Sequence, residues 1–508
     1  MVSLEKQFDE WARLEEGRLN KKKINKKEFS RAKRSYLHFD LRRKGDVKNL
    51  KEKFLDQNYI SQNGYWPFLK TVIKTPRIKN KKDSAGKVFR KKDPKIRDIY
   101  YASHFDSLIY SWYSFFLNNL YEEKIEKLNL DDCPVAYRKI KDNHGGGKSN
   151  INHAFEVFDF IRKKEECAVL VFDVSKFFDS LDHEILKKEW IGLLGVDGDK
   201  LPSDHYIIYK NLTKFKYVES DDIFKHLNIK FKKRKRKDEN GGVKIFNVPF
   251  RGSNSIRKIC NNRKEFLEKI VLNGFIKGNN NKNDEGFACG IMQGAPISAV
   301  LSNIYMLSFD LDVKRKIDEF GGIYKRYSDD IVVVCDLDKL DYFQEYILEN
   351  IKKYKLSINK EKVDVTIFKK NEQGFLRGFL NDKLKINFYK NLQYLGFEFN
   401  GLNLFIRSKS LANYYRNMKK KIRKSVNMAY GKKSKTKNNN NLVFKKKLFK
   451  KYLYKGQRSF ISYASRAMKL EDDMFSSDKI KKQLANRFKI MNNELQKRIA
   501  RNKYKTKL

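Results

Sequence analysis

Apolar residues recur every three or four positions in several segments, which predicts amphipathic helices. One such helix spans residues 151–162, and another spans 411–426, where Lys and Arg occupy the opposite side. A third begins directly after Pro296, because proline is well tolerated in the first turn of a helix. Its apolar positions are Ile297, Leu301, Ile304, Leu307 and Leu311.

Short continuous apolar runs predict buried strands. Cys167–Asp173 is one run of this length. Ile323–Tyr327 and Ile331–Cys335 are two more, and the few residues between them predict a tight turn. Because helices and short strands both occur along the chain, we expect an α/β fold.

Charged and turn-forming segments separate these elements. Residues 1–75 are predicted to be mostly helical and basic, and residues 80–95 to form a charged loop. Residues 231–250 and 279–284 are low in complexity or rich in turn-forming residues, and they mark an insertion. Residues 431–441 are predicted to form a flexible loop.

The chain is strongly basic. Its 508 residues include 111 Lys and Arg against 62 Asp and Glu, a formal net charge of +49. Residues 401–508 hold 32 basic and 5 acidic residues, and Lys230–Lys237 has seven basic residues in eight. Such a surplus favours nucleic acid as partner, because Lys and Arg neutralise phosphates and interleaved aromatic residues can stack on bases. The alternative is an AT-rich genome that encodes solvated lysine faces.

The cysteines and the apolar runs exclude other classes of protein. The five cysteines are scattered without a Cys-x-x-Cys pair, which argues against a disulfide framework and a four-cysteine zinc site. No run approaches the roughly 18 apolar residues of a membrane span. Met1–Arg18 lacks the apolar core of a secretion signal. We therefore expect a soluble, cytoplasmic protein with no membrane partner.

Acidic residues stand at the ends of the predicted strands. Asp329 and Asp330 lie in the turn Tyr327-Ser328-Asp329-Asp330, and Asp173 ends an apolar run. Adjacent carboxylates repel each other unless a cation neutralises them. Carboxylates that converge on two divalent ions can stabilise the displacement of a phosphoryl group. The alternatives are an Asp-rich surface turn and, for Asp173, a helix cap.

Two further segments carry candidate binding residues. Phe178 follows Asp173 within Phe177-Phe178-Asp179-Ser180, where plain core packing is the alternative. Gln293-Gly294-Ala295-Pro296 opens the predicted helix. Glycine there allows a ligand to approach the backbone closely, and the Gln side chain can meet a base or nucleotide.

Five segments in order resemble consecutive motifs of reverse transcriptases. They are FDVSKFFDSLDH (172–183), GIMQGAPISAVLSNIY (290–305), YSDD (327–330), LSINKEK (356–362) and YLGFEF (394–399). The resemblance extends upstream to KIRDIYYAS (95–103) and to AYRKI and KSNINHAF within 136–155. It is a resemblance to the bacterial group II intron and retron-like superfamily, and most of all to stand-alone, defence-associated enzymes.

The resemblance implies a right-hand polymerase fold of fingers, palm and thumb, with helical, basic extensions at both ends. Residues 1–75 would form the N-terminal extension and 76–165 the fingers. Residues 166–400 would form the palm with parts of the fingers and a basic insertion around 194–285. Residues 401–508 would form a basic helical thumb and C-terminal region.

The resemblance also implies the catalytic residues. Asp173, Asp329 and Asp330 would bind two Mg²⁺ ions, with the backbone carbonyl of Val174 assisting. Phe178 would pack under the sugar and exclude a 2′-hydroxyl, which would make dNTPs the substrates.

Further residues would bind the nucleotide. Arg97, with Lys95 nearby, would grip the triphosphate, since Arg forms charge-assisted bidentate bonds with phosphate. Gln293 and Gly294 would line the nucleotide pocket. Lys362 would protonate the pyrophosphate leaving group, with a solvated lysine as the alternative.

The implied activity is synthesis of cDNA from dNTPs on an RNA template, with a dedicated noncoding RNA in antiviral (phage) defence. Tyr394–Phe399 would form the hairpin that holds the primer. Three alternatives stay open: a retroelement enzyme of retron or group II intron type, an RNA-to-RNA polymerase and a catalytically silent RNA scaffold. The primer, which is an RNA end or a protein hydroxyl, and homo-oligomerisation are also left open.

The chain departs from the family pattern in three ways. The segment between Asp173 and Gln293 is long for the family, which leaves room for the basic insertion. The retron-type signature Asn-Ala-x-x-His is absent, and no zinc-binding His–Cys cluster follows the thumb region. Both absences favour a stand-alone enzyme over a retron or a mobile intron protein.

Overall fold

The computed structural model describes residues 3–20, 36–41, 46–82, 88–142, 145–237, 243–358, 363–381, 388–430, 442–456 and 459–507. The chain divides into two units, each built from several stretches of sequence. Unit 1 contains Met1–Tyr137, Val174–Asp312 and Glu349–Ser357, and unit 2 contains Arg138–Asp173, Val313–Leu348 and Ile358–Leu508. α12 (Leu307–Asp318) and α13 (Leu340–Lys353) have residues in both units.

Unit 1 combines helices with small sheets. Its helical segments are α1 (Leu4–Asn20), η1 (Lys48–Leu50), α2 (Lys51–Leu55), α3 (Gln57–Gln62), α4 (His104–Lys127), α6 (Phe177–Ser180), α7 (His183–Leu194), α8 (Ser203–Thr213), α9 (Ser220–His226), α10 (Arg263–Phe266), η2 (Leu267–Val271) and α11 (Ser298–Tyr305). Its strands are β1 (Phe68–Thr75), β2 (Ile78–Lys82), β3 (Val88–Lys92), β4 (Lys95–Tyr101), β6 (Lys216–Glu219), β7 (Ile229–Lys237), β8 (Val243–Arg251), β9 (Asn254–Ser255) and β10 (Lys277–Gly278). One sheet has the strand order β10-β6-β1-β4.

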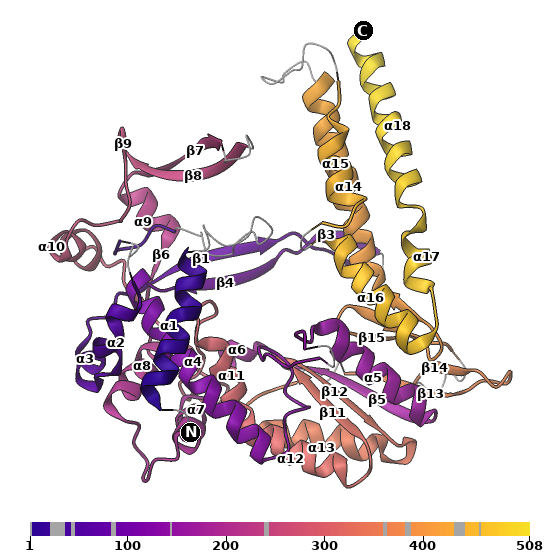
Figure 1. Ribbon diagram of the computed structural model, residues 1–508, viewed down its shortest axis with the longest axis horizontal. Helices are drawn as coiled ribbons and strands as arrows, with labels where there is room; N and C mark the ends of the chain where they lie inside the picture. The colour runs from indigo at the N-terminus through magenta and orange to yellow at the C-terminus, as the bar shows by residue number, and fades with distance from the viewer. Residues whose placement is uncertain are drawn as a thin grey trace. The chain divides into compact units, whose positions relative to one another are not determined.

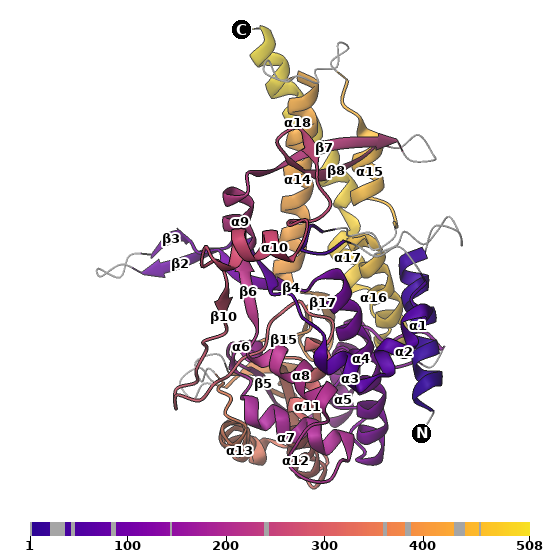
Figure 2. The same ribbon diagram turned by 90° about the vertical axis from the view of Figure 1, so that its left-hand side faces the viewer.

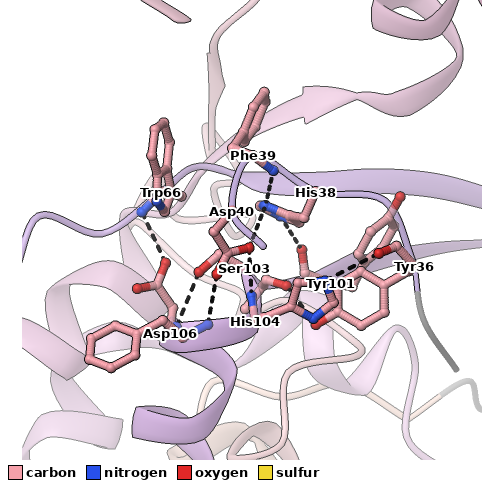
Figure 3. A network of polar contacts seen from close by, with 11 residues as sticks. Tyr36, His38, Phe39, Asp40, Trp66, Tyr101, Ser103, His104 and Asp106 are labelled. Atoms are coloured by element: carbon pink, nitrogen blue, oxygen red, sulfur yellow. Dashed lines mark hydrogen bonds and ion pairs between the residues drawn. The ribbon is translucent and has the colours of Figure 1, made fainter. Parts of the chain in front are cut away.

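A polar network joins β4 to the helix that follows it (Figure 3). The carboxylate of Asp40 accepts the backbone N–H groups of His104 and Phe105, each at 2.9 Å, and so caps the first turn of α4. Asp106, in the same turn, accepts the N–H of Trp66 at 3.0 Å. Burial raises the pKa of Asp106 to about 7. The network holds the C-terminal end of β4 against α4 and residues 36–40.

The loop predicted in unit 1 is wrong. Residues 80–95 contain strands β2 and β3, which pair as an antiparallel hairpin that extends away from the helices of this unit (Figure 2). Residues 231–250, predicted to mark an insertion, form most of the β7–β8 hairpin. Both segments are rich in Lys and Arg, so apolar alternation does not mark them, whereas backbone pairing needs no particular side chain. In addition, β1 occupies the end of the segment predicted to be mostly helical.

The predicted helix after Pro296 is two helices. α11 ends at Tyr305 and α12 begins at Leu307, with Met306 between them. The side-chain amide of Asn303 in α11 donates to the carbonyl of Ala136 at 3.0 Å, deep in unit 1. The apolar spacing continues through the break between α11 and α12, so the sequence pattern did not reveal the break.

Unit 2 is built around a five-stranded antiparallel sheet with the order β11-β12-β5-β13-β14 and a three-stranded sheet β15-β16-β17 (Figure 1). The strands are β5 (Cys167–Asp173), β11 (Ile323–Tyr327), β12 (Asp330–Cys335), β13 (Asp364–Lys370), β14 (Leu376–Leu380), β15 (Leu392–Tyr394), β16 (Phe397–Phe399) and β17 (Leu404–Ile406). Its helical segments are α5 (Asn150–Lys164), η3 (Leu337–Lys339), α14 (Ser408–Tyr430), α15 (Lys445–Tyr452), α16 (Phe460–Phe475), α17 (Lys479–Ala485) and α18 (Arg487–Lys507).

The core of unit 2 confirms the apolar patterns read from the sequence. The strands predicted at 167–173, 323–327 and 331–335 are β5, β11 and β12, and the helices predicted at 151–162 and 411–426 are α5 and α14. Apolar residues of these elements share one buried cluster with β15–β17 and the C-terminal helices. α14 and α18 run side by side (Figures 1 and 2). The loop predicted at 431–441 lies outside the described residues.

Two general properties follow from the described residues. No helix among them is both long enough and apolar enough to cross a membrane. All five cysteines are buried and carry free thiols.

Candidate active site

Two of the predicted catalytic carboxylates lie next to each other in unit 2. Asp330 is the first residue of β12 and is the direct cross-strand partner of Asp173, the last residue of β5. Opposed residues of an antiparallel pair point to the same face of a sheet, with Cβ atoms about 4.5–5.5 Å apart. The structure therefore brings Asp173 and Asp330 together on one face, at the end of the central strands.

Asp329 belongs to the turn that joins β11 to β12. Tyr327 pairs with Asp330, so Ser328 and Asp329 form a two-residue connection. Ser328 has a left-handed φ of 63° and is buried. The turn places Asp329 immediately before the opposed pair of carboxylates.

The chemistry of this pair fits a divalent cation. Carboxylate oxygens are the preferred ligands of Mg²⁺, and like charges directly opposite each other destabilise a sheet unless they are neutralised. Among the described residues, no group of three or more His, Cys, Asp or Glu side chains is arranged to hold a metal ion. The structure thus shows two opposed carboxylates, with Asp329 in the adjoining turn.

A buried lysine lies on the same sheet face and pairs with a partly exposed glutamate. Lys325 is 5% exposed and lies two residues before Tyr327, so its side chain is on the face of Asp330. Its ammonium group contacts Glu156 of α5 at 3.0 Å, and Lys148 contacts the same carboxylate at 2.6 Å. Burial by itself would raise the pKa of Glu156, but a hydrogen bond with His153 and the two lysines outweigh it and lower that pKa.

Tyr394 of β15 lies beside this group. Burial, together with the negative charges of Asp330 and Glu156, raises the pKa of its hydroxyl. That hydroxyl is buried and has no hydrogen-bond partner within the described part of the chain. β15 and β16 form the hairpin predicted at Tyr394–Phe399.

The predicted nucleotide-binding residues form a second group, in unit 1. The carbonyl of Gln293 accepts the N–H of Tyr100 in β4 at 2.8 Å. Gly294 has a φ of +120°, and a Cβ there would overlap the carbonyl oxygen of Tyr100. Only glycine therefore lets this segment approach β4 so closely. Phe178 joins the group because its carbonyl accepts the N–H of Ile291 at 2.8 Å.

The structure also shows the exposure of the other predicted site residues that it describes. Arg97 and Lys95 are exposed on β4, the strand that Gln293 contacts. Phe178 is half-buried, with its ring centroid 5.5 Å from that of Phe177. Val174 is buried directly after Asp173. Lys362 lies outside the described residues.

Sequence reasoning missed a basic groove of about 1430 Å³ in unit 2. One wall is a stripe on α14, where amide and ammonium side chains follow each other every three or four residues. Its members are Asn413, Asn417, Lys420, Lys424 and Asn427. Lys450 and Lys451 of α15 also line the groove, as do Leu395 and Gly396, which directly follow Tyr394. The helical spacing on α14 could have revealed the stripe, but its apposition to α15 could not be read from sequence.

Comparisons with solved structures find telomerases of low similarity. An apo telomerase from Candida tropicalis truncated from its C-terminal domain is 12% identical, with 70% of this chain and 59% of that chain covered and a TM-score of 0.33. The apo telomerase from the same organism is 15% identical (86% and 64% covered, TM-score 0.34). A Candida albicans telomerase in complex with a fragment of telomeric RNA is 14% identical (88% and 66% covered, TM-score 0.36). The chain thus spans about three fifths to two thirds of these proteins.

Part of the chain resembles a known protein family in sequence. No curated protein matches the chain. Residues 252–399 match the family model described as reverse transcriptase (RNA-dependent DNA polymerase). This segment contains Gln293, Gly294, Asp329 and Asp330, and β12 within it pairs with the strand that carries Asp173. Residues 252–399 are therefore similar to reverse transcriptases, enzymes that polymerise DNA on an RNA template.

Proposed function

We propose that this protein makes cDNA from dNTPs on an RNA template by two-metal phosphoryl transfer. The observation that carries the proposal is the opposed pair Asp173–Asp330, whose second member lies within the segment that matches reverse transcriptases. Asp329, in the adjoining turn, would complete the set of carboxylates. Mg²⁺ held by them would activate the attacking 3′-hydroxyl and neutralise charge on the phosphates. The backbone carbonyl of Val174 would assist.

The group in unit 1 supports nucleotide binding. Gly294 lets the backbone at Gln293 lie against β4, and β4 presents the exposed cations Lys95 and Arg97. Arg97 would form bidentate hydrogen bonds with a triphosphate, and Lys95 would add charge. Half-buried Phe178 would pack under the sugar and reject a 2′-hydroxyl. The protein would therefore use dNTPs in preference to rNTPs.

The groove in unit 2 supports binding of the nucleic acid. Leu395 and Gly396, which directly follow Tyr394, line this groove, and the negative charge of Asp330 helps to raise the pKa of the Tyr394 hydroxyl. Along α14 the ammonium groups of Lys420 and Lys424 can neutralise phosphates, while the amides between them can hydrogen-bond sugars and base edges. A strand that lies in this groove would lead toward the carboxylates.

The wider biological role rests on the resemblance to stand-alone enzymes and on the +49 charge. We propose a dedicated noncoding RNA as template and antiviral defence in the cytoplasm as the setting. Retroelement mobility and a silent RNA scaffold are the competing roles. The scaffold role requires no divalent cation at Asp173 and Asp330.

The role is tested with the protein purified together with its bound RNA. Mg²⁺ and dNTPs are added to the wild-type protein and to Asp329→Asn, and any DNA product is sequenced. The proposal predicts cDNA complementary to the bound RNA from the wild type alone. RNA bound equally by both proteins, with DNA from neither, would favour the scaffold. A product that copies a mobile element would favour a retroelement.

A further inference from the structure

The turn that contains Asp329 has a backbone conformation that is unfavourable for one of its residues. Ser328 is the first residue of the two-residue connection between β11 and β12, and its φ is 63°. Glycine is favoured at such positions because a Cβ is strained at positive φ. A serine there persists only where surrounding contacts over-determine the conformation. The structure shows which side chain makes such a contact.

Arg326 holds this turn from within unit 2. Its side chain is completely buried, and Nη1 donates to the carbonyl oxygen of Ser328 at 3.2 Å. Arg326 lies on the face of β11 opposite to Lys325 and Tyr327, because successive side chains of a strand alternate. It is therefore separate from the Lys325–Glu156 contact. The guanidinium group is planar and rigid, so a bond from it restricts the direction of the carbonyl as well as its position.

A fully buried arginine needs a specific role, because its charge costs solvation on burial. Here one of its bonds goes to the peptide unit that joins Ser328 to Asp329. A hydrogen bond from a cation is stronger than one between neutral groups. Rotation of that peptide unit would move Asp329 directly and Asp330 through the first pair of the hairpin.

We infer that Arg326 is a positioning residue, which holds the strained Ser328–Asp329 turn in the shape that presents Asp329 and Asp330 to a divalent cation. The inference rests on the proposed function of these carboxylates. Arg326 itself would not contact the substrate. Its effect passes through the backbone of Ser328.

The test uses the full chain and compares Arg326→Met, Ser328→Gly, the double variant and Ser328→Ala. Binding of Mn²⁺ to the protein without nucleotide is measured by titration calorimetry. In parallel, kcat and KM for dNTP are measured on an RNA template with a DNA primer. Arg326→Met should weaken Mn²⁺ binding and lower kcat by about tenfold or more, as expected for loss of a charge-assisted hydrogen bond, while KM changes little.

The second substitution separates positioning from a general structural role. Glycine adopts positive φ without strain, so adding Ser328→Gly to Arg326→Met should restore most of the lost Mn²⁺ binding and kcat. Ser328→Ala removes the hydroxyl but keeps the Cβ, and it should give no rescue. A loss that Ser328→Gly leaves unchanged, or no loss in Arg326→Met, would overturn the inference.

If Arg326→Met does not fold, Arg326→Lys keeps the charge but loses the planar fork, and it should show the same loss and the same rescue. If the wild type binds Mn²⁺ in a manner that Asp330→Asn abolishes but incorporates no dNTP, the proposed function fails while the Mn²⁺ titrations still decide the role of Arg326. Wild-type protein that binds no Mn²⁺ would overturn the inference as well.

Discussion

Asp330 lies directly opposite Asp173 across β12 and β5, although the two residues are far apart in the sequence. Their side chains share a face only because of this register, since a shift by one residue would turn one of them to the other face. The register is held by apolar side chains that are buried on both sides of the central strands, among them Phe172 and Val332. The acidic pair is thus a consequence of how the core packs.

Gly294→Ala should damage unit 1. The new Cβ would meet the Tyr100 carbonyl at a φ of +120°, which is unfavourable for any residue with a Cβ. We expect a loss of about 1–3 kcal/mol in the free energy of unfolding and a lower rate of dNTP incorporation. Urea denaturation measures the free energy of unfolding, and primer extension measures the rate of dNTP incorporation.

Gly192→Ala is the matched control for this substitution. Gly192 lies within α7 and a Cβ there meets nothing within 4 Å. Alanine should leave the stability unchanged or raise it by up to about 1 kcal/mol, because it favours a helix more than glycine does. Equal stabilities of the two variants would refute the close approach of Gly294 to β4.

Phe178→Ala should relax the choice between dNTPs and rNTPs. The half-buried ring would no longer oppose a 2′-hydroxyl, so the ratio of kcat/KM for rNTP to that for dNTP should rise by about tenfold or more, as expected for loss of a steric contact. Single-nucleotide extension with both kinds of substrate measures the ratio. Unchanged rejection of rNTPs would remove Phe178 from the sugar site.

Replacing Lys420 and Lys424 by Ala should weaken binding to RNA and reduce its salt dependence. The slope of log K against log salt is negative, and each lost phosphate contact reduces its magnitude by roughly 0.7–0.9. Lys419→Ala is the control, because Lys419 is exposed on α14 but does not line the groove. Fluorescence anisotropy between 50 and 300 mM salt, roughly the range over which phosphate contacts are lost, measures the slope. A slope equal to that of the wild type would exclude the groove as the RNA site.

The stability of unit 1 should depend on pH through Asp106. Burial raises its pKa to about 7, so between pH 4 and 7, roughly, the folded chain holds a proton that the unfolded chain has released. The contribution of Asp106 to the free energy of unfolding therefore falls as pH rises through this window. Asp106→Asn cannot titrate, and its stability should fall less over the same window. Urea denaturation at several pH values compares the two proteins, and parallel curves would contradict the raised pKa.

The sequence predicts an element well where a pattern of apolar residues marks that element. The strands that carry Asp173 and Asp330 were predictable because their runs are short, apolar and buried. The β2–β3 hairpin was missed because its strands are rich in charged residues and lack the alternation of apolar and polar residues that predicts a strand. Its backbone hydrogen bonds do not depend on amino-acid composition. The helix break at Met306 was missed because apolar spacing continues across it.

In the candidate site, too, some residues could be named from the sequence and others could not. Motif order names Asp173, Asp329, Asp330 and Gly294 as candidates, but it does not point to Arg326, which is buried and donates to the carbonyl of Ser328. Arg326 has no periodic or motif signal, since its role depends on the conformation of a neighbouring peptide. The groove depends on helices that meet only in the folded chain, and no local pattern predicts such a meeting.

The most direct test of the central claim is incorporation of dNTPs on a defined RNA template with a DNA primer in Mg²⁺. Wild-type protein is compared with Asp330→Asn and with Asp338→Asn, which changes an exposed acid paired with Lys339. We predict incorporation by the wild type and by Asp338→Asn, and its loss in Asp330→Asn while RNA binding persists. Equal incorporation by all three proteins, or by none of them despite bound RNA, would contradict the assignment of the Asp173–Asp330 pair as a polymerase centre.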